Sequence, residues 1–91
     1  MNRDQRMIER NIELSAEFSR YLFEHPEIET RIPVGAELVL LPDFDTELKA
    51  YNSALGKKME EEGDSVMYVS IKSIHPKSLS RIDKIELASV A

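Results

Sequence analysis

Apolar side chains recur at helical spacing over residues 3–24. They form one stripe that includes Met7, Leu14 and Phe18, while charged side chains occupy the opposite side, and this pattern predicts an amphipathic helix. Pro26 ends the helix, because the residue before a proline is pushed away from helical angles. The chain therefore begins with a long helix that buries one face.

The middle of the chain predicts a strand, a helix and a second strand. Residues 36–41 form an apolar run without alternation, which is typical of a strand covered on both faces. Residues 44–62 have helical spacing, and residues 65–74 alternate as a strand does. Two strands joined by a crossover helix in under 40 residues form a βαβ unit, so we expect them to be parallel.

Two shorter segments complete the predicted architecture. Residues 26–35 form a connection with one or two turns of helix, and Ile28 and Ile32 are expected to face inward. Near the end of the chain, Ile85 and Leu87 alternate with charged residues, which predicts a third strand over residues 81–87.

These elements define an α/β protein with a single domain over residues 1–91. We expect a small two-layer α-βαβ unit with a short, mainly parallel sheet and the third strand at its C-terminal end. The helices would cover one face of the sheet and leave an apolar face with Val66 and Tyr68 exposed. A homodimer would cover that face, and the alternative is that the tail, residues 78–91, folds back over it.

Composition and charge exclude several classes of protein. With 42% hydrophobic and 32% charged residues the chain is a soluble globular protein, and its net charge of −5 argues against nucleic acid or an anionic membrane as a partner. There is no cysteine, no apolar run that could span a bilayer and no signal core at the start. We therefore expect a cytoplasmic protein, and the few amides beside many charges are typical of thermophilic proteins.

Four polar residues follow the carboxyl ends of the two predicted strands. Asp43 and Asp45 come after the first strand, and His75 and Lys77 come after the second. Ligands of open α/β sheets bind at this edge, so the four side chains could bind a metal or a small molecule, or carry out acid–base chemistry. The alternative, which we favour, is that the aspartates cap the helix that begins at residue 44 while His75 and Lys77 lie on the surface.

Asn52 is the remaining candidate, because it falls on the apolar face of the helix over residues 44–62. A buried amide must find hydrogen-bond partners, and it could bond a backbone carbonyl, meet Asn11 or point into a ligand site. We favour the structural role over the ligand site. No nucleotide-binding, nucleophile or zinc motif occurs, so no cofactor is predicted.

The residues that stand out resemble a family of short uncharacterised prokaryotic proteins. The resemblance spans most of the chain and rests on Asn11-x-x-Leu14-x-x-x-Phe18, Ile32-Pro33-x-Gly35-Ala36, Pro42-x-x-Asp45-x-x-Leu48-x-x-x-Asn52 and Ser80-Arg81. It implies no catalytic residue, because the family has no assigned activity or cofactor. The positions worth testing are Pro33, Gly35, Asp45, Asn52 and Arg81.

Two function hypotheses follow from the sequence. The first is a small homo-oligomeric interaction or regulatory protein, with a protein partner in the manner of an antitoxin. The second is a small-ligand or metal-dependent enzyme with its site at the carboxyl ends of the strands.

Overall fold

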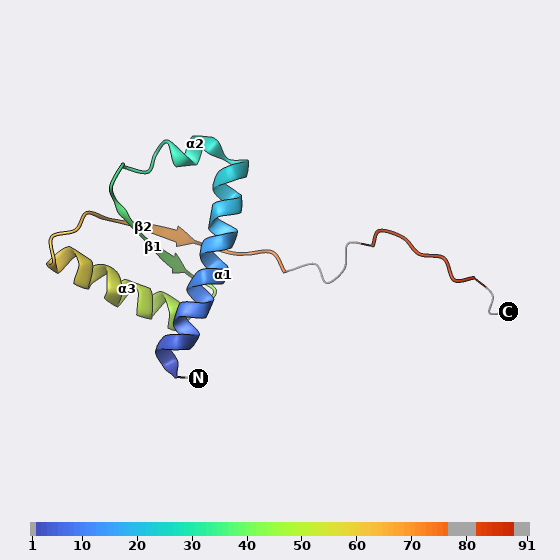
Figure 1. The fold of residues 1–91 in the computed structure, drawn as a ribbon, viewed down its shortest axis with the longest axis horizontal. Helices are drawn as coiled ribbons and strands as arrows, with labels where there is room; N and C mark the ends of the chain where they lie inside the picture. Colours follow the sequence, from blue (N-terminus) through green and yellow to red (C-terminus); the bar gives the residue numbers. More distant parts are fainter. Residues whose placement is uncertain (1, 77–81, 89–91) are drawn as a thin grey trace.

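The computed structural model describes residues 2–76 and 82–88 and confirms the α/β architecture (Figure 1). The five helices and strands of these residues follow in the order α1 (Arg3–Glu24), α2 (Pro26–Glu29), β1 (Glu37–Pro42), α3 (Thr46–Glu61) and β2 (Val66–Ile71). None of the helices in the described part of the chain combines the length and the apolar character needed to cross a membrane.

Helix α1 is fixed at its start by a capping box. The side chain of Asn2 accepts a hydrogen bond from the backbone N–H of Gln5 at 2.8 Å, and the Gln5 side chain accepts one from the Asn2 N–H at 3.1 Å. These bonds satisfy backbone donors that have no partner within the helix. At the other end the backbone N–H of His25 bonds the carbonyls of Tyr21 and Leu22, and Pro26 begins α2.

Strands β1 and β2 are parallel and adjacent, as the spacing of the βαβ unit predicts. Glu37 pairs with Val66 at one end of the ladder, and Pro42 pairs with Ile71 at the other. The second strand is shorter than the predicted 65–74, because β1 ends at Pro42 and offers residues beyond Ile71 no partner. Chain direction therefore brings the carboxyl ends of both strands to the same edge.

The core lies between α1, the sheet and the start of α3. Met7 and Leu14 of α1 pack with Leu40 of β1 and Leu48 of α3. Half-buried side chains surround this cluster, namely Phe18, Tyr51, Val69 and Ile71. The helical stripe and the strand alternation thus meet in one small core.

Helix α3 runs beside the outer edge of β1. The N–H of Glu37 donates to the carbonyl of Ser65, the residue before β2, so alternate residues of β1 direct their backbone groups away from β2. Leu40 is one of these residues, and its carbonyl accepts a hydrogen bond from the Asn52 amide of α3 at 2.8 Å. Since α3 occupies this edge, the open edge of the sheet is that of β2.

The expectation that Val66 and Tyr68 lie on an uncovered sheet face is wrong for Tyr68. The ring of Tyr68 packs on the backbone of α3 at Gly56, where an added Cβ would lie 2.6 Å from the tyrosine Cε1. Its strand neighbour Val39 is only 5% exposed. The absence of a side chain at Gly56 lets the Tyr68 ring reach the backbone of α3.

The predicted third strand is also absent from the described residues. Residues 82–88 form no strand, and Arg81 lies outside the described residues. Figure 1 shows residues 82–88 far from the sheet, and the radius of gyration is 18.3 Å, against about 12 Å for a compact chain of this length. Alternation alone does not form a strand, because a strand also needs a neighbour with which to pair.

Candidate functional site

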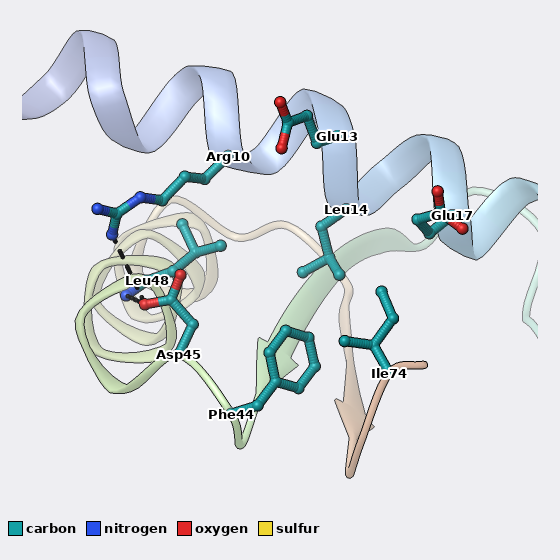
Figure 2. Close-up of a pocket in the computed structure, with 8 residues that line it drawn as sticks. All are labelled: Arg10, Glu13, Leu14, Glu17, Phe44, Asp45, Leu48 and Ile74. Atoms are coloured by element: carbon teal, nitrogen blue, oxygen red, sulfur yellow. Dashed lines mark hydrogen bonds and ion pairs between the residues drawn. The ribbon is translucent and has the colours of Figure 1, made fainter. Parts of the chain in front are cut away.

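A hollow of about 160 Å³ lies between α1 and the carboxyl ends of the two strands (Figure 2). Its position agrees with the rule that open α/β sheets bind ligands at this edge. Eight residues line it: Arg10, Glu13, Leu14, Glu17, Phe44, Asp45, Leu48 and Ile74.

The floor of the hollow is apolar and its rim is charged. Leu14 of α1 and Leu48 of α3 meet Phe44 and Ile74, which come from the segments that follow β1 and β2. Phe44 and Ile74 are each nearly half exposed, so the floor is open to solvent. Figure 2 shows Glu13 and Glu17 above this floor, and they are one turn apart on α1. An apolar group with a positive charge at one end would fit such a surface.

Asp45 belongs to the start of α3. Its carboxylate accepts a hydrogen bond from the backbone N–H of Leu48 at 3.2 Å and is the N-cap of the helix. The guanidinium of Arg10 lies 3.6 Å from the same oxygen and forms a 2.8 Å ion pair with Glu47. Asp45 therefore stabilises the helix terminus and positions Arg10 at one side of the hollow.

The carboxylate of Asp43 forms ion pairs with two lysines. One carboxylate oxygen bonds Lys49 at 2.8 Å, and the other lies 3.1 Å from Lys72. The hydrogen bonds and charges of these lysines hold the pKa of the Asp43 carboxyl below its ordinary value. The pairing links the start of α3 to the end of β2 and leaves the carboxylate ionised at neutral pH.

The structure does not unite the four residues that the sequence grouped at this edge. Asp45 caps α3 as the favoured interpretation has it, and Asp43 has lysine partners. His75 is exposed, and Lys77 lies outside the described residues. Among residues 2–76 and 82–88, no three His, Cys, Asp or Glu side chains are grouped so that they could hold a metal ion.

Sequence reasoning missed Arg10, Glu13 and Glu17 of the hollow because they lie on the polar side of a helical stripe. Such residues are normally solvated, and their spacing carries no signal that distinguishes a pocket rim from an ordinary surface. Phe44 and Ile74 have a weak signal, since each is an apolar residue within three positions of the end of a strand.

Asn52 joins three elements of the fold. Its amide nitrogen donates to the Leu40 carbonyl of β1 and to the Asn11 side-chain oxygen of α1, each at 2.8 Å. The Asn11 amide donates back to the Asn52 oxygen at 2.9 Å. These are two of the partners that the sequence suggests for a buried amide. A second hollow of about 140 Å³ adjoins the pair, but both amide protons of Asn52 are already used.

The comparisons with known proteins identify a family. A family model described as a family of unknown function (DUF5647) matches residues 6–85, which is most of the chain, and the chain belongs to this family. The resemblance seen in the sequence is thereby confirmed. No curated protein and no solved structure matches the chain.

Proposed function

We propose that this protein is a small homo-oligomeric interaction protein that acts by binding other chains in the cytoplasm. One observation carries the proposal. The described residues bury five hydrophobic side chains as a core, whereas twelve large hydrophobic side chains are exposed. A domain of this size is marginally stable alone, and association is a common way to cover such a surface.

The exposed apolar side chains are concentrated on two parts of the described chain. Ile8, Ile12, Tyr21 and Phe23 lie along α1, and Ile82, Ile85 and Leu87 lie in the tail. Single exposed apolar residues are ordinary on protein surfaces, but groups of them on one element favour an interface.

The negative net charge of the chain favours a positively charged protein as a partner, in addition to a second copy of this chain. The chain has 17 acidic and 12 basic residues, and the three helices carry ten of the acidic residues and seven of the basic ones. A basic protein would be attracted to such a surface, as an antitoxin attracts its toxin, and this comparison is an analogy of charge and size alone.

Light scattering coupled to size exclusion tests the oligomeric state. We expect a mass of twice the 10.4 kDa of one chain at micromolar protein concentration. A mass near 10.4 kDa across the whole concentration series would refute the proposal.

The hollow of Figure 2 supports a second candidate function, the binding of a small amphipathic cation. Its apolar floor beside the carboxylate of Glu13 is the observation that favours this ligand class, since Glu17 is already paired with Arg20. Titration of isotope-labelled protein with butylamine should shift the backbone NMR resonances of Leu14 and Ile74. Butanol is the matched uncharged control. Equal shifts with both compounds, or none with either, would contradict the candidate.

A further inference from the structure

The structure points to an exchange of strands between two copies of this chain: we propose that residues 82–88 of each copy pair with the open edge of β2 in the other. The inference rests on the proposed homo-oligomer and names the segments that form its interface. It depends on the open edge, the helix above it and the extended tail.

The edge of β2 that faces away from β1 has unpaired backbone groups. Because Ile71 bonds Asp43 and Ser65 bonds Glu37, the intervening residues Val66, Tyr68 and Ser70 direct their N–H and C=O groups outward. No backbone group of residues 2–76 bonds to them. An open edge of this kind is a template for one more strand.

Helix α1 already covers the place where that strand would lie. The helix starts over α3, where Arg3 stacks on the ring of Tyr51, and continues across the sheet past β2 in both views (Figures 1 and 2). From Phe18, which packs on the core, to Glu24 the helix rises about 9 Å, close to two strand spacings. Tyr21 is the next position on the core-facing stripe and remains 49% exposed. Helix α1 is therefore long enough to cover a sheet of three strands, whereas the described residues supply two.

The tail has the pattern of the missing strand. Ile85 and Leu87 would lie on one face of an extended segment, with Lys84 and Glu86 on the other. The two apolar side chains are 68% and 89% exposed. The family model extends to residue 85, so the beginning of this segment belongs to the family's common pattern. On the edge of β2, Ile85 and Leu87 would face the underside of α1.

A second copy is the favoured donor because residues 82–88 of each chain lie far from the β2 edge of the same chain (Figure 1). The extents of 70 × 37 × 18 Å show how far the chain reaches from its body. Reciprocal exchange about a two-fold axis would pair both β2 edges with both donated segments at once. Exchange in one direction would leave one β2 edge and one donated segment exposed.

Amide hydrogen exchange together with light scattering tests the proposal on the full chain. In the wild-type dimer we expect the outward amides of Val66, Tyr68 and Ser70 to exchange at least about tenfold more slowly than unpaired amides. The amides of Met67 and Val69 face β1 and serve as internal controls. Ile85→Asp should halve the mass measured by light scattering, because a charge would have to enter an apolar contact. It should also speed the hydrogen exchange of the outward amides, but not that of the amides that face β1.

Val34→Asp is the matched control, because Val34 is fully exposed and distant in sequence from both the edge and the tail. It should leave the mass and the exchange rates unchanged, and Leu87→Asp should repeat the effect of Ile85→Asp. A monomer with protected outward amides would show that the tail pairs with its own sheet, which overturns both the exchange and the proposed oligomer. A dimer that survives both tail substitutions, or whose outward amides are unprotected, would overturn the exchange alone.

Discussion

Replacement of Asn52 by leucine should destabilise the fold, although leucine is more hydrophobic and forms helices more readily. Asn52 is 4% exposed, and its amide forms three hydrogen bonds that join α1, β1 and α3. Leucine has a similar size and makes none of them. The carbonyl of Leu40 would then be buried without a partner.

The magnitude follows from the three bonds. An unsatisfied buried carbonyl costs about 1–3 kcal/mol, and each lost bond to Asn11 adds about 0.5–1.5 kcal/mol. Burial of the leucine side chain returns about 1.5–3 kcal/mol. We therefore expect Asn52→Leu to lower the free energy of unfolding by about 1–3 kcal/mol.

Urea denaturation followed by helical circular dichroism measures this change. All variants are compared at one protein concentration, because association of the proposed kind would contribute to apparent stability. Ala54→Leu adds the same side chain at an exposed position of α3 and should leave the midpoint nearly unchanged. A midpoint that stays constant or rises in Asn52→Leu would refute the reasoning.

A double-mutant cycle with Asn11→Leu separates the contribution of the amide pair from that of the Leu40 carbonyl. Each single variant leaves the partner amide without its bonds, so the double variant should be less destabilised than the sum of the two by about 0.5–3 kcal/mol. Simple additivity would show that the Asn11–Asn52 bonds contribute little and that Asn52 acts through Leu40 alone.

Three further substitutions test particular contacts. Gly56→Ala should lower the free energy of unfolding in urea by about 1–3 kcal/mol, because the new Cβ would lie 2.6 Å from the Tyr68 ring. Lys57→Ala, at the neighbouring position, should not lower it. A Gly56→Ala protein that is more stable than wild type would show that helix propensity outweighs the clash. Asp45→Ala should cost about 0.5–2 kcal/mol in the same assay through loss of the N-cap, and an unchanged midpoint would refute the capping role. Asp43→Asn should lower the melting temperature at pH 7, because the folded-state pKa of Asp43 lies below its ordinary value of 3.8 and the resulting stability is present above that pH. The difference in melting temperature between variant and wild type should close as the pH falls through the folded-state pKa. A difference that is equal at acid and neutral pH would contradict the electrostatic origin.

Local signals predicted most of the helices and strands correctly. The stripe with Met7 and Leu14 predicted the bounds of α1, and Pro26 ended it as expected. Asp45 was recognised as a possible cap because capping depends on residues three positions apart. The parallel pairing followed from the length of the crossover, which is also a property of neighbouring sequence.

The candidate site was predicted less well because its contacts join distant parts of the chain. Arg10 reaches Asp45 and Glu47 from α1, and the hollow exists only because α1 lies above the ends of both strands. Asp43 meets Lys72 where β1 and β2 end together. Strand direction predicted this edge, but which cation reaches which carboxylate depends on side-chain reach.

The sequence by itself determined where helices and strands form, because periodicity, caps and prolines act within a few residues. It also marked Asn52 as a buried amide that needs partners. Only the tertiary structure decided that those partners are Asn11 and Leu40, that Tyr68 lies on Gly56, and that α3 covers one edge of the sheet and leaves the other open. These outcomes depend on how preformed elements pack, and packing is set by the shape and hydrogen bonding of residues far apart in the chain.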